Sequence, residues 1–95
     1  MASDYVLESH LKDRIARLPV EAQFRLLTCL DELVADPEPD GKTRLPIAPS
    51  YPYPPGHMLA ECDEWAIRYR FMSGTNHEII VVLHIAPLPL PPADL

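Results

Sequence analysis

A proline-rich stretch divides this chain and limits what can form on either side of it. Residues 37–56 contain seven prolines, and four more lie in residues 87–95. Proline lacks a backbone N–H and fixes its φ angle, so neither a helix nor a central strand continues through such a density. Regular structure is therefore expected in residues 3–36 and 57–86, joined by a loop and followed by a tail. At this length, a single domain over residues 1–95 is predicted.

Residues 3–36 are predicted to form a helix hairpin. Apolar residues recur at spacings of three and four, as on one face of a helix, first at Leu7, Leu11, Ile15 and Leu18. Ser3 or Asp4 is expected to cap this helix, and Pro19 to end it, because the residue before a proline avoids helical geometry. Pro19 also suits the first turn of a second helix, whose predicted apolar face is Val20, Phe24, Leu26, Leu27, Leu30, Leu33 and Val34. The short joint predicts antiparallel helices.

Residues 57–86 are predicted to form an antiparallel sheet. Alternating apolar and polar residues mark strands at 57–62 and 64–71, and turn residues follow them. The segment 77–85 is apolar on both faces, which is typical of a central strand. Apolar matching predicts the pairs Cys62–Trp65, Ala60–Ile67, Met58–Tyr69, Phe71–Ile79, Tyr69–Val81, Ile67–Leu83 and Trp65–Ile85. The predicted fold class is α+β, with the helix hairpin packed on one face of a three- to four-stranded antiparallel sheet.

The same register places polar side chains together on the face that the helices leave open. It sets His57 beside Arg70 and His84 opposite Ala66, so that the face holds His57, Glu61, Arg68, Arg70 and His84, together with Leu59, Ile80 and Val82. Two guanidinium groups can hold a phosphate through paired hydrogen bonds, and histidine or glutamate can transfer protons near neutral pH. Such a set could support attack of an RNA 2′-hydroxyl on its phosphate.

The candidate catalytic residues are therefore Arg68, Arg70, His84 and Glu61, and the candidate substrate-binding residues are His57, Arg68 and Arg70. The alternative is an ordinary solvent-facing sheet surface, on which Glu61 and Arg68 form a diagonal ion pair. No metal site is expected, because His57 and His84 lie on separate strands without a third ligand. No cofactor is expected either, since the chain has no phosphate-binding glycine loop.

The cysteines and the charge set further bounds. Cys29 and Cys62 lack the spacing of metal ligands and are predicted to be small buried hydrophobic residues, with a disulfide or a metal pair as the alternative. The net charge of −6 opposes general nucleic-acid binding, although residues 41–72 hold four bases against three acids, so any anion site is expected there. No apolar run could span a membrane and no signal peptide is evident, so a cytoplasmic protein is expected.

The loop and the tail allow two interpretations each. Residues 37–56 are expected to form an ordered wrap in which Tyr51 and Tyr53 cover an edge of the core, with a mobile functional loop as the alternative. The tail favours polyproline II geometry and is expected to be a spacer, with a groove-binding motif as the alternative.

Several motifs, taken in order, resemble the RelE/ParE superfamily of bacterial toxins. They are Ile15-Ala-Arg-Leu-Pro19, Gln23, Leu33-Val-Ala-Asp-Pro37, Asp63-Glu-Trp-Ala-Ile-Arg-Tyr-Arg-Phe71 and Ile79-Ile-Val-Val-Leu-His-Ile85. The resemblance covers residues 10–86 and implies a helix hairpin on a sheet. It also implies a toxin neutralised by a cognate antitoxin. RelE-like members cut messenger RNA on the ribosome, and ParE-like members inhibit DNA gyrase.

The chain departs from the family pattern at several points. The opening strand of the family is shortened or missing before Tyr5, Ala66 replaces an arginine, and a later basic stretch is replaced by Ala86-Pro-Leu-Pro. Only Arg68 and His84 fall on positions that are basic in the family. One hypothesis is therefore a ribosome-dependent mRNA endoribonuclease. The other is a non-catalytic toxin-fold protein that binds an antitoxin or DNA gyrase. A homodimer is compatible with either.

Overall fold

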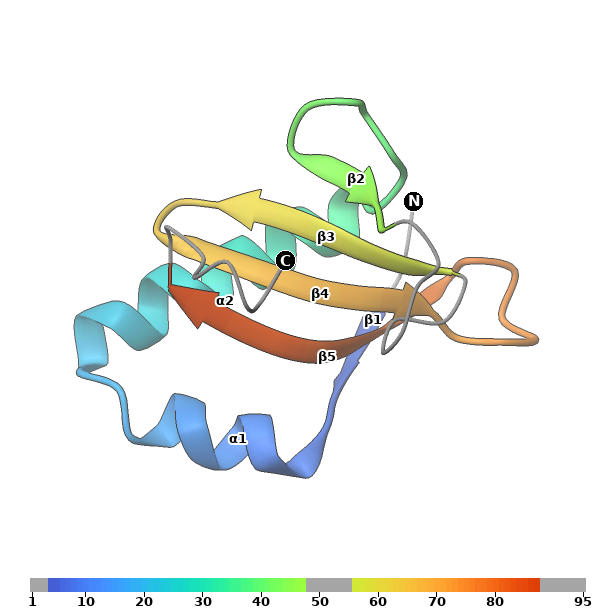
Figure 1. Ribbon diagram of the computed structural model, residues 1–95. Coiled ribbons are helices and arrows are strands. Elements are labelled where there is room, and N and C mark those ends of the chain that lie inside the picture. Colours follow the sequence, from blue (N-terminus) through green and yellow to red (C-terminus); the bar gives the residue numbers. More distant parts are fainter. Residues whose placement is uncertain (1–3, 48–55, 88–95) are drawn as a thin grey trace.

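The computed structural model describes residues 4–47 and 56–87 as a two-layer α+β arrangement (Figure 1). Its elements, in chain order, are β1 (Asp4–Leu7), α1 (Ser9–Ala16), α2 (Val20–Ala35), β2 (Arg44–Pro46), β3 (His57–Cys62), β4 (Trp65–Phe71) and β5 (Ile79–Pro87). Both helices pack on the same face of the sheet, where Leu11 of α1 and Leu26 of α2 meet Ile67 and Tyr69 in one buried core. The expected fold class is confirmed. No helix in the described part of the chain is long and apolar enough to cross a membrane.

The sheet has five strands rather than the expected three or four, in the order β1-β5-β4-β3-β2. Neighbouring strands are antiparallel except β1 and β5, which run parallel. The two strands missing from the prediction, β1 and β2, are short and lie at the two edges. Because β5 pairs with β1 on one side and β4 on the other, it is a central strand, as its apolar sequence predicted.

The prediction that Ser3 or Asp4 caps the first helix is wrong for Asp4, while Ser3 lies outside the described residues. Asp4–Leu7 is strand β1, and α1 begins only at Ser9. Parallel pairing with β5 satisfies the backbone of β1, and it turns Tyr5 and Leu7 toward the core. Leu7 and Leu11 both face the core, but Leu7 belongs to β1 and Leu11 to α1. Their four-residue spacing therefore does not come from one helix. The opening strand that the sequence suggested was shortened or missing is present.

The predicted apolar face of α2 is partly wrong. The buried residues of this helix are Ala22, Leu26, Cys29, Leu30 and Leu33. Val20, Phe24 and Leu27 are instead exposed, at 66%, 68% and 38%. The helix carries more apolar residues than one face can bury. Which of them face the sheet therefore depends on how α2 packs on the sheet, and not on hydrophobicity alone.

The cysteines form a disulfide between the middle of α2 and the end of β3. Cys29 and Cys62 are joined with Cα atoms 5.8 Å apart. Cys29 is buried, as the sequence predicted, but the reading of the pair as two separate hydrophobic residues is wrong. The disulfide links α2 to the end of β3, next to the turn that leads into β4.

Polar contacts hold the described part of the proline-rich loop, among them those of Asp40 and Tyr69. The Asp40 carboxylate accepts the backbone N–H groups of Lys42, Thr43 and Arg44 at 2.8–2.9 Å, which holds the pKa of Asp40 well below its usual range. The buried Tyr69 hydroxyl donates a hydrogen bond to the Pro37 carbonyl. Tyr51, Tyr53 and the tail after Pro87 lie outside the described residues, so the expectations for them stay predictions.

Candidate functional site

The register between β3 and β4 follows the prediction at every position. Cys62 pairs with Trp65, Ala60 with Ile67 and Met58 with Tyr69, and these side chains face the helices. On the other face, His57 pairs with Arg70, Leu59 with Arg68 and Glu61 with Ala66. The tight turn at Asp63 and Glu64, where Asp63 takes a positive φ of 54°, fixes this register locally.

The predicted register between β4 and β5 is wrong. Phe71 pairs with Ile80, Tyr69 with Val82, Ile67 with Ile85 and Trp65 with Pro87. The connection between the strands is one residue longer than predicted, because the Met72 N–H bonds to the Ile79 carbonyl at 2.8 Å and closes the turn there. Ile80 and Val82 therefore turn into the core, and not onto the polar face as expected.

A β-bulge then returns His84 to the predicted face. Arg68 pairs with His84 while the next residue, Tyr69, pairs with Val82, so Leu83 is an extra residue in β5. His84 lies opposite Arg68 rather than opposite Ala66. The bulge thus brings the histidine closer to the arginines than the prediction placed it, and Ile85 still points into the core.

Four side chains form what we call the polar cluster: His57, Arg68, Arg70 and His84. All four are half-buried. The Arg68 Nη1 atom lies 3.4 Å from His57 Nδ1, and Arg70 Nη1 donates to the Phe71 carbonyl at 3.4 Å. Because a guanidinium can only donate, His57 Nδ1 accepts this hydrogen bond, and the imidazole is neutral in this arrangement.

Electrostatics supports the same protonation state. Burial lowers the pKa of His57 below its ordinary value, and the positive charges of Arg68 and Arg70 lower it further. The polar cluster is surrounded on this face of the sheet by buried apolar residues, namely Ala66, Val81 and Ala86. Apolar surroundings lower the local dielectric constant, which strengthens the attraction of two guanidinium groups for an anion.

Glu61 lies at the rim of this face. Its side chain is exposed, it pairs with Ala66, and its backbone N–H donates to the Thr43 carbonyl at 2.9 Å. The structure therefore brings four of the five predicted site residues together and leaves the fifth at the margin. No group of three or more potential ligand side chains within residues 4–47 and 56–87 could hold a metal ion.

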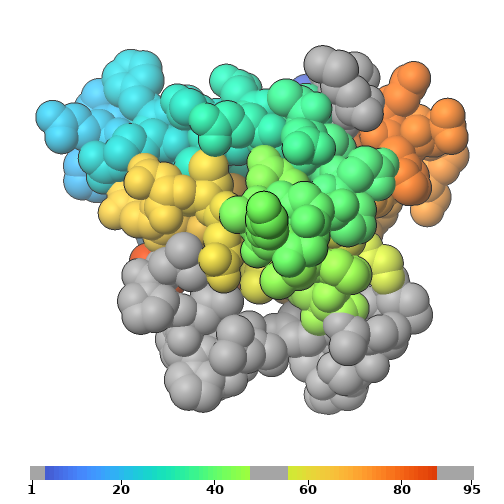
Figure 2. Space-filling view, turned by 90° about the horizontal axis from the view of Figure 1, so that it is seen from above, coloured from blue at the N-terminus to red at the C-terminus, as the bar shows by residue number. Residues whose placement is uncertain are grey.

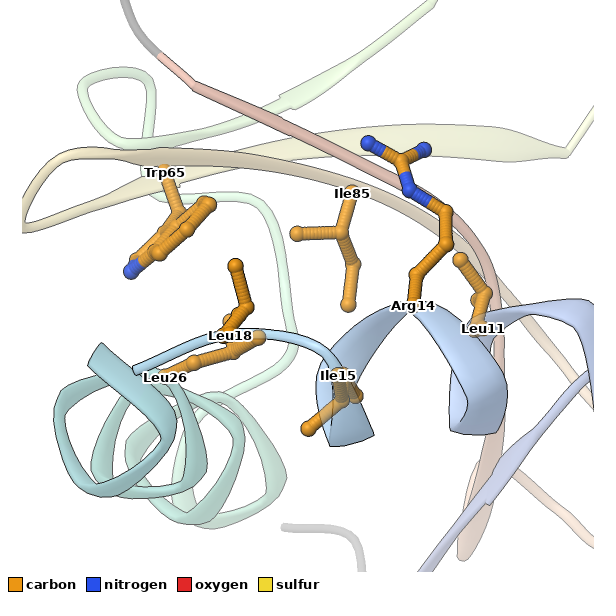
Figure 3. Close-up of a pocket in the computed structure, with 7 residues that line it drawn as sticks. All are labelled: Leu11, Arg14, Ile15, Leu18, Leu26, Trp65 and Ile85. Atoms are coloured by element: carbon orange, nitrogen blue, oxygen red, sulfur yellow. The ribbon is translucent and has the colours of Figure 1, made fainter. Parts of the chain in front are cut away.

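A small hollow lies between the helix joint and the sheet (Figure 3). Its volume is about 30 Å³, and it is lined by Leu11, Arg14, Ile15, Leu18, Leu26, Trp65 and Ile85. Figure 3 shows apolar side chains from the two helices and the sheet converging on it. A hollow of this size is a packing defect of the core and is too small for a ligand.

Comparisons with known proteins identify the fold. No known protein family and no curated protein matches this chain. A chain of the toxin–antitoxin complex RelBE2 from Mycobacterium tuberculosis matches with a TM-score of 0.70 and 14% identity, over 92% of this chain and 99% of the other. A chain of the archaeal RelE–RelB complex from Pyrococcus horikoshii matches with a TM-score of 0.67 and 17% identity, over 96% of this chain and 100% of the other. The chain therefore has the RelE-like toxin fold that its sequence motifs implied.

Proposed function

We propose that this chain is the toxin of a toxin–antitoxin system and that it cleaves messenger RNA on the ribosome. The polar cluster carries this proposal. Arg68 and Arg70 are alternate residues of β4 and supply two guanidinium groups on one face of the sheet, and His84 is paired with Arg68 across the strands. The likeness to chains of RelB–RelE complexes supports a cognate antitoxin as the partner.

The proposed reaction needs no group from outside the RNA and the protein. Arg68 and Arg70 bind the non-bridging phosphate oxygens, and His57 orients the Arg68 guanidinium through its Nδ1 atom. The 2′-oxygen attacks phosphorus while the bond to the 5′-oxygen of the next nucleotide breaks. A base takes the 2′-hydroxyl proton and an acid protonates the leaving oxygen, which gives a 2′,3′-cyclic phosphate and a 5′-hydroxyl. His84 is the first candidate for proton transfer, and Glu61 at the rim is the second.

The acidic charge favours a second candidate function. With a net charge of −6, the chain has weak general affinity for nucleic acid. A non-catalytic toxin-fold protein that binds an antitoxin or DNA gyrase would not need that affinity. In this case the polar cluster contributes to a protein interface and no RNA is cut.

Induced expression in bacteria separates the two functions. We expect growth arrest together with mRNA cleavage at ribosome-bound sites, and we expect Arg68→Ala to abolish both, because it removes a phosphate ligand at the centre of the polar cluster. Cleavage sites are mapped by sequencing RNA ends carrying 5′-hydroxyl groups. The matched control is Arg17→Ala, an exposed arginine at the end of α1, which should leave both effects intact.

The other outcomes are equally informative. Growth arrest without cleavage supports inhibition through a protein target. Unimpaired growth with the folded wild-type protein contradicts toxin activity of either kind. Thermal melts of the purified variants ensure that loss of activity in Arg68→Ala is not loss of folding.

A further inference from the structure

The outward face of α2 carries an apolar stripe with no partner in the described structure. Val20, Phe24 and Leu27 follow one another at spacings of four and three, so they share one side of the helix. Phe24, at 68% exposed, points almost directly away from the buried side of α2. A helix packed on a sheet normally turns polar residues outward, so an exposed phenylalanine between two aliphatic residues is unexpected.

The stripe borders an open groove. The groove lies between α2 and the end of β3, has a volume of about 360 Å³, and is lined by Phe24, Arg25, Thr28, Cys29, Glu32, Cys62 and Asp63. Figure 2 shows the two walls side by side, with α2 in cyan and teal and the end of β3 with the following turn in yellow. The disulfide forms part of the wall, so the separation of the two walls is covalently fixed. We call the stripe and the groove together the α2 patch.

The rim of the α2 patch is acidic. Its carboxylates are Glu21, Asp31, Glu32, Asp63 and Glu64, all of them exposed. Arg25 is already engaged, with its Nη2 2.7 Å from Glu64 Oε1 and its Nε 3.6 Å from Asp63 Oδ2. The other nearby base, Arg44, reaches the Glu32 backbone carbonyl at 3.5 Å. Five acids against two bases leave this surface negative.

We propose that the α2 patch binds an amphipathic, basic segment of a second polypeptide, with an apolar side chain in the groove and Lys or Arg on the acidic rim. The apolar stripe and the groove match the face of an amphipathic helix, and the rim charges select basic flanks. A second copy of this chain is disfavoured as the occupant, because it would bring two negative patches together within a dimer of acidic chains. The α2 patch lies on the helix side of the sheet, whereas the polar cluster lies on the opposite face, so this binding is separable from chemistry at the polar cluster.

The test uses a pair of designed peptides and the full chain with its disulfide intact. Both peptides carry leucines at i, i+3, i+4 and i+7, and they differ only in having lysine or glutamate at the remaining positions. Binding is followed by fluorescence anisotropy of the labelled peptide. We expect the lysine peptide to bind, the glutamate peptide not to bind, and added salt to weaken the complex.

Substitutions in the α2 patch distinguish docking from simple charge attraction. Phe24→Asp should weaken binding at least tenfold, even though it adds a negative charge that by itself favours a basic peptide. Thr28→Trp should weaken binding by filling the groove from an exposed position. The control is Leu45→Asp, an exposed apolar residue of β2 outside the patch, which should bind as the wild type does.

Three results would overturn the proposal. One is equal binding of the two peptides, or of neither. Another is a lysine peptide that binds Phe24→Asp and Thr28→Trp as tightly as the wild type, which would indicate non-specific attraction. The third is a dimer in sedimentation velocity that Phe24→Asp dissociates, which would make a second copy the occupant. Circular dichroism melts confirm that each variant is folded.

Discussion

At the scale of single residues, His57 links the polar cluster to the pH dependence of folding. Its pKa is lowered in the folded chain by burial and by Arg68 and Arg70, so between that lowered value and about 6.5 the unfolded chain binds more protons. The unfolding free energy therefore rises with pH through this interval. The contribution of His57 is fully present above the ordinary histidine pKa and is lost as the pH falls through the lowered pKa. Acid should weaken the fold partly through this one side chain.

We expect His57→Gln to flatten the pH dependence of the unfolding free energy just below the ordinary histidine pKa of about 6.5. Glutamine keeps an acceptor for Arg68 but cannot take up a proton. Urea unfolding at several pH values measures the difference between wild type and variant, which removes the contribution of the other histidines. His10→Gln, at an exposed position on α1, is the control. An unchanged slope in His57→Gln would contradict the inferred protonation state.

Tyr69 holds the segment after α2 against the sheet. Its hydroxyl donates to the Pro37 carbonyl inside the core, and burial raises the pKa of Tyr69 well above 10. Tyr69→Phe leaves a buried carbonyl without its donor, so we expect a loss of about 1–3 kcal/mol of stability in urea unfolding. Tyr5→Phe, at a half-buried position on β1, should cost less. A cost for Tyr69→Phe no greater than for Tyr5→Phe would show that this hydrogen bond is dispensable.

At the scale of elements, the pairing across a tight turn could be predicted from the sequence, whereas pairings across longer connections could not. The β3–β4 register follows from the tight turn at Asp63 and Glu64, which pairs Cys62 with Trp65 and keeps the apolar residues of both strands on one face. The β4–β5 register depends on turn length and on a bulge at Leu83, neither of which changes the apolar pattern of β5. Strand β1 was missed because its partner lies at the other end of the sequence.

The same distinction applies to the candidate site. His57 and Arg70 were placed correctly beside each other through the local register of β3 and β4. His84 was assigned to the right face, but for a reason that the structure overturns, since the bulge compensates for the register error. The exposed stripe on α2 was not found, because Val20, Phe24 and Leu27 have the same apolar character as the buried residues of that helix.

The disulfide between α2 and β3 should contribute substantially to stability. Closing a link across a sequence separation of 33 residues restricts the unfolded chain by about 3–4 kcal/mol. We expect dithiothreitol to lower the wild-type melting temperature and to leave a Cys29→Ala, Cys62→Ala double variant unchanged. An unaffected wild type would mean that the cross-link does not stabilise the fold. The disulfide also counts against the expected cytoplasmic location, because reducing systems in the cytoplasm keep most thiols free.

At the scale of the whole molecule, the acidic surface predicts weak binding to free RNA. We expect little binding of a labelled single-stranded RNA at about 150 mM salt, because the net charge of −6 opposes the phosphate backbone despite the basic polar cluster. Fluorescence anisotropy measures this directly. Tight binding to free RNA, lost in Arg70→Gln, would show that the polar cluster outweighs the global charge. Weak binding would leave the ribosome to supply the affinity in the proposed cleavage reaction.

The parallel pairing of β1 with β5 has a consequence for synthesis in the cell. Strand β1 leaves the ribosome before the other strands of the sheet and has no partner until the last of them, β5, has also emerged, so a nascent chain cannot complete its sheet before then. His84 belongs to that last strand, and the polar cluster is assembled only at the same moment. A protein that is proposed to attack translating ribosomes would thus remain harmless to the ribosome that is making it.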